Sequence, residues 1–363
     1  MKKLILKAPF NSLSLGNVSY NIARELYNKE IEVSLFPHAG NFDFSPFDKL
    51  DKDFKKWLEN SANSRLHTID SKTPCLSVWH LNDSIDMPGK KTFLYTFYEA
   101  NDPTFTEKKI CDFHDHVIFS SSYAKQSFDN VGCSNTSYTP LGWDVDFFET
   151  NKDYLKDKIH FGLIGKWEKR KHTEKIIKAW IKKFGNNPDY QLSCCIVNPF
   201  FKTDEMNFVI GQALENKHFS NVNFLPRLKT NSEINDLMNS IDIDLSGLSG
   251  AEGWNLPAFN STCLGKWSTV LNATSHTDWA NENNSILLEP DGQESIIDGL
   301  FFKDGTDFNQ GEMYSLSEEM IIDILEKSLQ FKDKVNTEGK KLKKQFSYKK
   351  TVESIVEIID SNV

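Results

Sequence analysis

The segment from Ile241 to Lys266 constrains the fold more than any other, because it joins a strand, a loop of small residues and a helix. Apolar residues alternate from Ile241 to Leu245, small residues fill 246–251, and an apolar helical run containing Pro257 follows Glu252. Backbone N–H groups at a helix start have no partner within the helix and lie at the positive end of its dipole, so they can hold an anion. The same pattern is also compatible with an ordinary strand-to-helix connection.

The length and composition predict a globular protein with two domains. A chain of 363 residues exceeds the roughly 150 residues of a typical domain. Its residues are 39% hydrophobic and 12% aromatic, which is enough to form real cores. The formal net charge of −9 argues against nucleic acid as a partner.

The apolar runs and the cysteines predict the compartment. No apolar run approaches the roughly 18 residues of a membrane helix. The N-terminal apolar run is interrupted by Lys7, so it predicts a buried strand instead of a signal peptide. None of the six cysteines forms a C-x-x-C pair, which favours free thiols over a disulfide framework. We therefore expect a cytoplasmic protein.

The first half of the chain opens with a β-loop-α-β pattern. A strand at 4–8 leads through a loop with Gly16 into a helix, and a second strand follows at 31–36. The loop lacks G-x-G-x-x-G, which disfavours a dinucleotide redox cofactor. Gly16 would either let a ligand approach the backbone or form a turn with positive φ. Residues 37–73 show weak periodicity and are interpreted as a variable excursion.

Two features of the first half concern ligands. A strand at 92–96 leads into Glu99, and an acidic residue just past the carboxyl end of a parallel strand lies where open α/β sheets bind ligands. Glu99 could equally cap a helix or lie on the surface. His114 and His116 have no third ligand at a recognisable spacing, so no metal site is predicted.

The second half repeats the pattern after a charged linker at 151–158. A strand at 160–164 runs into Gly165 and the cationic loop 166–172, and a helix follows at 173–184. Lysine charges and helix-start donors would together hold phosphate, although a solvated charged loop has the same composition. The remaining predicted elements are strands at 191–197, 222–225, 268–272 and 286–289, a helix at 233–240, and helices from Ser317 onward.

The C-terminal segment 327–350 carries nine lysines, together with a helical stripe of apolar residues. This pattern is typical of packing helices with a solvated face. A weak contact with a membrane or an acidic partner is the alternative.

Several of these stretches together resemble the retaining GT-B glycosyltransferases of family 4. The matching stretches are Ser121-Ser122-Tyr123 (serine-start helix), Pro140 to Asp144 (P-x-G-V-D turn), Gly165 to Lys171 (G-R/K-x(4)-K), Glu252 to Pro257 (E-G-x-G-L-P), Tyr95 to Asp102 and Ser275 to Trp279. The resemblance covers most of the chain except residues 37–73.

The resemblance implies an α/β GT-B fold, in which two Rossmann-like domains face each other across a cleft. The acceptor-side domain would span 1–155, the nucleotide-sugar-binding domain 156–335, and the C-terminal helices 336–363, which return to the first domain. The implied reaction moves a hexosyl or pentosyl group, with retention and without a metal, from a nucleotide-diphosphate-sugar donor. The hydroxyl acceptor would be a glycan, a lipid-linked molecule or a small molecule.

The resemblance also implies roles for single residues. Lys166 and Lys171 would neutralise the donor diphosphate, and Glu252 would contact the donor sugar. The other donor-binding positions would be Gly16, Glu99, Gly165, Leu228, Gly253, Trp254, Asn255, Leu256 and Asn260. Negative charge grows on the diphosphate as the glycosidic bond breaks, and fixed cations with helix-end donors would stabilise it. No cofactor or metal is then needed for that task.

Two positions depart from the family pattern. The second glutamate of E-x(7)-E falls on Asn260, whose carbonyl accepts a hydrogen bond without the charge of a carboxylate. The second glycine of E-G-x-G-L-P is Asn255, a residue type that tolerates left-handed backbone. A non-catalytic sugar-nucleotide or glycan-binding module of the same fold, and a transferase acting on a modified nucleic-acid base, are the alternative functions.

Overall fold

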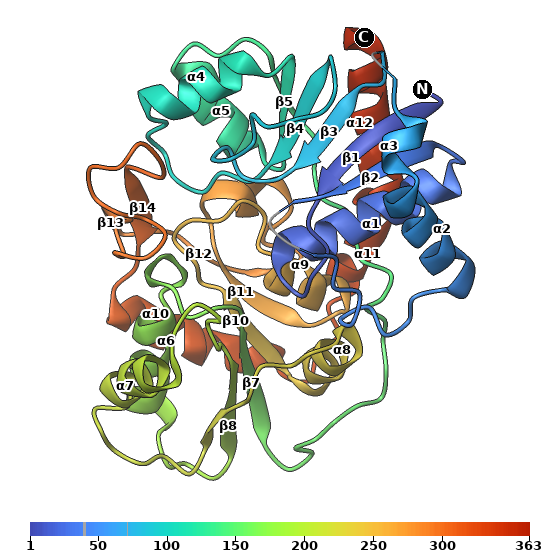
Figure 1. Ribbon diagram of the computed structural model, residues 1–363. Coiled ribbons are helices and arrows are strands. Elements are labelled where there is room, and N and C mark those ends of the chain that lie inside the picture. Colours follow the sequence, from blue (N-terminus) through green and yellow to red (C-terminus); the bar gives the residue numbers. More distant parts are fainter. Residues whose placement is uncertain (39–40, 71) are drawn as a thin grey trace.

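The computed structural model describes residues 1–38, 41–70 and 72–363, which form two α/β domains (Figure 1). The first domain contains β1 (Lys3–Ala8), β2 (Glu32–Pro37), β3 (Cys75–Val78), β4 (Thr92–Thr96), β5 (His116–Phe119) and β6 (Thr136–Tyr138). Its helices are α1 (Ser14–Asn28), α2 (Lys52–Asn63), α3 (Arg65–Thr68), α4 (Phe105–Phe113) and α5 (Ser122–Asn130).

The second domain repeats this architecture. Its strands are β7 (Ile159–Ile164), β8 (Tyr190–Cys195), β9 (Val222–Phe224), β10 (Ile243–Gly247), β11 (Trp267–Leu271) and β12 (Ile286–Leu288), with a separate antiparallel hairpin of β13 (Gly292–Ser295) and β14 (Glu312–Ser315). The helices are α6 (Thr173–Phe184), α7 (Thr203–Ala213), α8 (Asn231–Ser240), α9 (Leu256–Cys263), α10 (Glu318–Ser328) and α11 (Thr337–Gln345), with short 3-10 turns η1 (Lys169–Lys171), η2 (Thr274–Asp278) and η3 (Leu329–Phe331).

The strand order explains where a ligand would bind. The first sheet has the order β2-β1-β3-β4-β5-β6 and the second has β12-β11-β10-β7-β8-β9, and the pairings within both sheets are parallel. The order reverses between β1 and β3, and again between β7 and β10. Open α/β sheets bind ligands at such reversal points, beyond the carboxyl ends of the strands. The predicted two-domain α/β fold is therefore confirmed.

The last helix, α12 (Tyr348–Asn362), returns to the first domain and packs along α1, as predicted (Figure 1). Glu353 pairs with Lys29 at 3.1 Å between the carboxylate oxygen and Nζ. The turn at the end of the first domain also contacts α12, because a Cβ on Gly142 would overlap the backbone of Tyr348. Glycine is therefore needed there for the close approach of α12.

The variable excursion at 37–73 contains helices α2 and α3, which were not predicted. Asp51 caps α2 by accepting hydrogen bonds from the backbone N–H groups of Asp53 and Phe54. Phe54, Leu58 and Ala62 are buried along one face at a spacing of four. That spacing was a local signal for a helix. Positions 39, 40 and 71 of the excursion lie outside the described residues.

The lysines of the C-terminal segment lie beside buried apolar residues. Lys340 and Lys343 both pair with Glu149, at 2.6 and 3.0 Å, and Leu342 between them is buried. This arrangement fits a solvated face of packing helices. A contact of this segment with a membrane or an acidic partner stays a prediction. Within the described part of the chain, no helix is long and apolar enough to cross a membrane.

A buried carboxyl group in β10 makes stability depend on pH. The Asp244 side chain is fully buried, accepts hydrogen bonds from the backbone N–H and the hydroxyl of Ser246, and forms no ion pair with any residue that the structure describes. Burial raises the pKa of Asp244 to about 6. This folded-state pKa lies above the ordinary value of 3.8. Below pH 3.8 the carboxyl group is therefore protonated in both states and does not lower the free energy of unfolding. As the pH rises from 3.8 to about 6, Asp244 lowers the free energy of unfolding progressively.

The Asp244→Asn variant should therefore be more stable than the parent chain at pH 7. A shift of about two pKa units corresponds to about 3 kcal/mol, and asparagine keeps the acceptor for Ser246. Urea unfolding at pH 7 and pH 4 would measure the difference, which should be much smaller at pH 4. The exposed Asp304→Asn substitution serves as the control. Equal unfolding free energies of the variant and the parent at pH 7 would contradict this explanation.

Candidate donor-binding site

The loops at the carboxyl ends of the two sheets meet each other between the domains. Ser120, just past β5, donates a hydrogen bond from its hydroxyl to the carbonyl of Gly253 at 2.8 Å. The backbone N–H of Ser122 donates to a carboxylate oxygen of Asp278 at 2.8 Å. These contacts bring the E-G-x-x-L-P loop after β10 against the serine-start helix α5. The two predicted ligand-binding edges therefore lie against each other.

A network of alternating charges lies in the loop after β7. The ammonium of Lys171 contacts Oε1 of Glu252, and Nη1 of Arg170 lies 3.1 Å from Oε2 of the same carboxylate. Nη2 of Arg170 lies 2.7 Å from Glu168, whose other oxygen is 2.6 Å from Nζ of Lys166. Three cations thus surround two carboxylates. The network keeps one net positive charge, which suits an anionic ligand.

The network is buried and its charges are fixed. The side chains of Arg170 and Glu252 are 9% and 6% exposed. Burial alone would raise the pKa of Glu252, but Lys171 and Arg170 outweigh it and lower that pKa to about 2. Burial also acts against ionisation of Glu168, yet the charges of Arg170 and Lys166 hold its pKa below the ordinary value. Both carboxylates are therefore ionised at neutral pH.

Sequence analysis missed Glu168 and Arg170, although both lie inside the cationic loop that it singled out. Arg170 joins this loop to the loop after β10, because its Nη1 donates to the carbonyl of Ala251 at 2.6 Å. In return, the N–H of Gly250 donates to the carbonyl of Arg170 at 2.7 Å. A run of charges looks the same in sequence whether it is solvated or buried, so no sequence signal separates Arg170 from its neighbours.

Lys166 is held by aromatic rings as well as by Glu168. Its ammonium lies 4.8 Å from the ring centroid of Phe301 and 5.7 Å from that of Phe200. A cation over an aromatic face is attracted by the ring quadrupole. Beside it, the N–H of Gly165 donates to the carbonyl of Cys195 at 3.0 Å. The structure thus brings Gly165, Lys166 and Lys171 into one loop, as predicted.

Asn255 begins helix α9 in a left-handed conformation, with φ of +68°. Its amide nitrogen donates to the carbonyl of Ser246 at 2.8 Å and to Nε2 of His276 at 3.0 Å. Nδ1 of His276 donates to the carbonyl of Leu271 at 2.9 Å, and burial lowers the pKa of His276 to about 4, so the ring is neutral. Asn255 therefore adopts the left-handed backbone that its residue type tolerates, and its side chain anchors the start of α9.

Gly253 and Trp254, which precede Asn255, could reach a ligand only through their backbones. A Cβ on Gly253 would lie 2.8 Å from Cβ of Phe97, so glycine allows this loop to touch the first domain. The Trp254 side chain is 2% exposed and packs edge-on against Phe259 and Phe346, with centroid distances of 5.4 and 5.5 Å. The prediction that the backbone of this loop holds the donor is compatible with this packing, and it stays a prediction.

Leu256 and Asn260 lie on α9 itself. Leu256 is the first residue of the helix and is half-buried. Asn260 is 4% exposed, and its Oδ1 accepts no hydrogen bond from the residues that the structure describes. Buried polar atoms are nearly always paired in native proteins, so this free acceptor distinguishes Asn260 from the other buried amides of the domain.

Gly16 and Glu99 are the two predicted donor-binding residues of the first domain. Gly16 lies in the first turn of α1 without positive φ, so its interpretation as a turn glycine is wrong. A Cβ there would overlap the backbone of Asn11, which makes glycine a requirement of local packing. Glu99 does not cap α4, because Thr104 and Glu107 form that cap. Glu99 is half-buried, and its charge helps to raise the pKa of Arg170.

Leu228 and the histidines complete the predicted set. Leu228 is half-buried against the apolar cluster that includes Trp254, in the loop between β9 and α8. Nε2 of His114 forms a hydrogen bond with the hydroxyl of Ser84 at 2.9 Å, and Nε2 of His116 forms one with the hydroxyl of Ser137 at 3.0 Å. Over the described ranges, no group of three or more His, Cys, Asp or Glu side chains is arranged to hold a metal ion.

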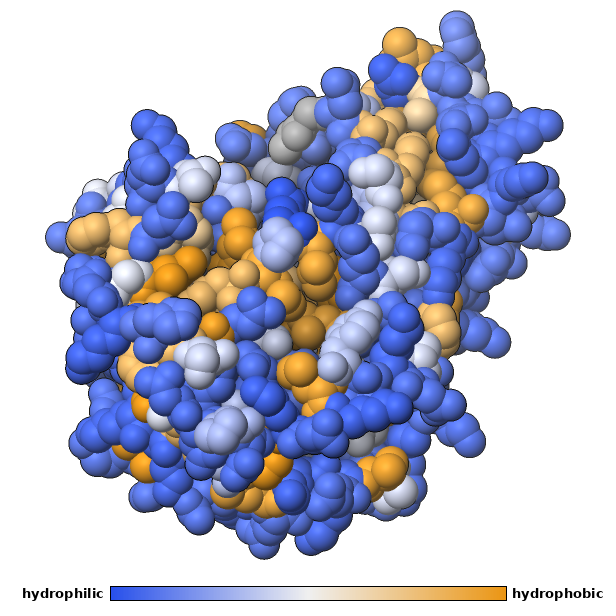
Figure 2. Space-filling view, turned by 90° about the horizontal axis from the view of Figure 1, so that it is seen from below, coloured by the Kyte–Doolittle hydropathy of each residue, from blue (hydrophilic) through white to orange (hydrophobic). Residues whose placement is uncertain are grey.

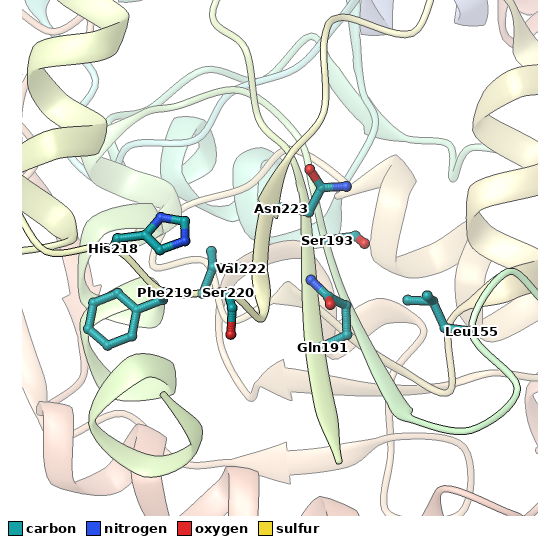
Figure 3. Close-up of a pocket in the computed structure, with 8 residues that line it drawn as sticks. All are labelled: Leu155, Gln191, Ser193, His218, Phe219, Ser220, Val222 and Asn223. Atoms are coloured by element: carbon teal, nitrogen blue, oxygen red, sulfur yellow. The ribbon is translucent and has the colours of Figure 1, made fainter. Parts of the chain in front are cut away.

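A shallow pocket of about 380 Å³ lies elsewhere in the second domain (Figure 3). It is lined by Leu155, Gln191, Ser193, His218, Phe219, Ser220, Val222 and Asn223, around β8 and β9. Apolar residues also gather in a recess of the face seen from below (Figure 2). None of the residues lining the pocket belongs to the charge network, so this pocket is not the predicted donor site.

Known proteins share the fold of this chain at low sequence identity. No model of a known protein family matches the sequence, and no curated protein does. HepE of Anabaena, solved in complex with UDP-glucose, is similar in structure with a TM-score of 0.64 and 13% identity over 99% of both chains. Sucrose-phosphate synthase of Thermosynechococcus elongatus has a TM-score of 0.71 and 10% identity over 99% of both chains. The α,α-trehalose 6-phosphate synthase of Burkholderia multivorans has a TM-score of 0.63 and 9% identity over 99% of this chain and 96% of its own. The architecture is therefore that of the GT-B glycosyltransferases.

Proposed function

We propose that this protein is a retaining, metal-independent glycosyltransferase that moves a hexosyl or pentosyl group from a nucleotide-diphosphate sugar to a hydroxyl acceptor in the cytoplasm. The observation that carries the proposal is the Lys171–Glu252–Arg170 network beside the start of α9, at the strand-order reversal of a GT-B domain. The structure of HepE with UDP-glucose supports a nucleotide-sugar donor.

The two cations that contact Glu252, Arg170 and Lys171, would have different roles. Arg170 is anchored on Ala251 and Glu168, so it would keep Glu252 in place when a ligand arrives. Lys171 holds Glu252 through a flexible side chain, and its ammonium could transfer to the donor diphosphate. Glu252 would then accept hydrogen bonds from hydroxyls of the donor sugar.

The proposed chemistry needs stabilisation of a leaving group. The bond between the anomeric carbon and the diphosphate oxygen breaks, and its electron pair goes to that oxygen. Lys171, Lys166 and the backbone N–H groups from Gly253 to Leu256, at the start of α9, would stabilise the growing charge. The acceptor oxygen attacks from the same face, and its proton goes to the departing diphosphate. The free Oδ1 of Asn260 would accept a hydrogen bond from a ribose hydroxyl.

A donor panel tests this proposal. The protein is titrated calorimetrically with UDP-, GDP- and ADP-sugars, and each mixture is then assayed for sugar transfer and for slow hydrolysis. We expect saturable binding of at least one donor and release of its nucleoside diphosphate, with an α-linked donor giving an α-linked product by NMR. Binding without hydrolysis or transfer, under any acceptor, would instead identify a non-catalytic module. An inverted product would overturn the retaining mechanism.

A further inference from the structure

The hairpin β13–β14 and its loop, residues 292–315, belong to the second domain but pack against the first; we call this segment the strap. Figure 1 shows it beside α4 and α5. Ile296, Phe302 and Met313 of the strap are at most 5% exposed. They share one apolar cluster with first-domain residues, including Tyr98 and Phe128. The second domain therefore contributes side chains to a core of the first.

Hydrogen bonds reinforce this apolar contact. In the strap, the N–H of Asn309 donates to Oε1 of Glu107, and the N–H of Glu312 donates to Oδ1 of Asn101, both at 2.8 Å. The carbonyl of Asp307 accepts a hydrogen bond from the hydroxyl of Thr104 at 2.6 Å. The backbones of Asp102 and Gln310 form an isolated antiparallel bridge. These partners lie at the start of α4 and just before it, so the strap is fixed to one place on the first domain.

The other side of the strap contacts the loops of the charge network. Nζ of Lys169 donates to the carbonyls of Ser295 and Ile297, at 2.5 and 3.1 Å. The N–H of Tyr314 donates to the carbonyl of Gly250 at 2.9 Å. Phe301 of the strap also lies beneath the ammonium of Lys166. The strap therefore connects the loop after β7 and the loop after β10 directly to α4.

We propose that the strap locks the two domains in one closed arrangement, so that the site is assembled before any ligand binds. Domains joined by a small polar interface are expected to move relative to each other. Here, separation would expose three buried apolar side chains and break the hydrogen bonds to Asn101, Thr104 and Glu107. The loops that carry Lys166, Lys171 and Glu252 are thereby held at a fixed distance from Glu99.

Gly311 offers a sharp test of the lock. A Cβ at this position would overlap Oδ1 of Asn101 and lie 2.9 Å from Cβ of Asp102, so Gly311→Ala should push the strap off the first domain. Gly305→Ala is the matched control. Gly305 also lies in the strap and also has positive φ, +66° against +111°, but a Cβ there has no neighbour within 4 Å. Both variants strain the backbone, and only Gly311→Ala creates a collision.

The readouts are small-angle X-ray scattering and hydrogen exchange of the full chain without ligand. We expect the parent and Gly305→Ala to scatter as the closed structure, while Gly311→Ala has a larger radius of gyration. Amides of Phe105–Phe113 and of residues 250–254 should exchange at least about 10-fold faster in Gly311→Ala. Parent scattering that fits only an open or mixed population would overturn the lock, and so would unchanged exchange in a folded Gly311→Ala.

A milder variant covers the case in which Gly311→Ala does not fold. Asn101→Ala removes only the acceptor for the N–H of Glu312 and should speed exchange at the same amides by a smaller factor. Unchanged exchange in Asn101→Ala, with Gly311→Ala unfolded, would also overturn the lock. These readouts need no donor or acceptor, so their outcome is independent of the proposed sugar transfer.

Discussion

The Lys171→Ala variant should turn over its nucleotide sugar at least about 100-fold more slowly than the parent chain. The ammonium of Lys171 is the cation on Glu252 that could transfer to the diphosphate. Charge stabilisation of this kind is needed most when the bond to the leaving group breaks. The loss should therefore appear mainly in kcat, with a smaller change in KM. Steady-state kinetics with saturating donor, using the sugar nucleotide identified by the donor panel, would measure it.

Lys178→Ala is the matched control for this substitution. Lys178 lies further along the chain, in α6, and forms an exposed pair with Glu174 four residues away, so its removal deletes the same charge outside the network. The kcat of Lys178→Ala should stay within about twofold of the parent value, because exposed ion pairs contribute little to stability. Full turnover by Lys171→Ala, or an equal loss in Lys178→Ala, would show that Lys171 has no special role in stabilising the leaving group.

Several elements with a local signal were predicted correctly from the sequence. The helix at 173–184 and the strand at 92–96 have the predicted bounds, because amphipathic spacing and apolar runs depend only on neighbouring residues. Asn255 has left-handed backbone, which its residue type tolerates. Helix α2 was missed despite such a signal at Phe54, Leu58 and Ala62.

The rest of the site depends on contacts between distant parts of the chain. Ile296, Phe302 and Met313 are spaced without any regular period, because they pack on a domain about 200 residues earlier in the chain. Glu107 is likewise an ordinary capping residue in sequence, and its bond to Asn309 depends on the position of the strap. Pairing between elements so far apart leaves no pattern in a single sequence.

The loss of Arg170 should strongly destabilise the fold. Arg170→Met removes a buried guanidinium that lies between Glu168 and Glu252 and leaves the carbonyl of Ala251 with only the long hydrogen bond from the Ser249 hydroxyl, at 3.4 Å. Breaking a buried ion pair by removing one partner typically costs about 3–5 kcal/mol, and we expect a value near 3 kcal/mol because the lysines still pair with both carboxylates. Urea unfolding at pH 7 would measure this loss.

Two comparisons separate the loss of charge from the loss of packing. Arg227→Met removes an exposed guanidinium that donates to the hydroxyl of Ser12, and it should change the unfolding free energy by less than about 0.5 kcal/mol. The double variant Arg170→Met with Glu168→Gln also removes the charge of a buried carboxylate that has lost one of its two cationic partners, so part of the stability should return. If the double variant were no more stable than Arg170→Met alone, lost packing would account for the defect.

The loss of stability in Arg170→Met should depend on pH in a defined direction. The folded-state pKa of Glu252 is about 2, below its ordinary value of 4.5, so its ion pairs contribute stability that is fully present above pH 4.5 and is lost as the pH falls through about 2. Arg170 supplies part of that contribution. The difference between the parent and Arg170→Met should therefore be largest near neutral pH and should narrow as the pH falls from 4.5 toward 2. A difference that stayed constant over this range would mean that Arg170 stabilises the fold by its contacts with Ala251 and not by its charge.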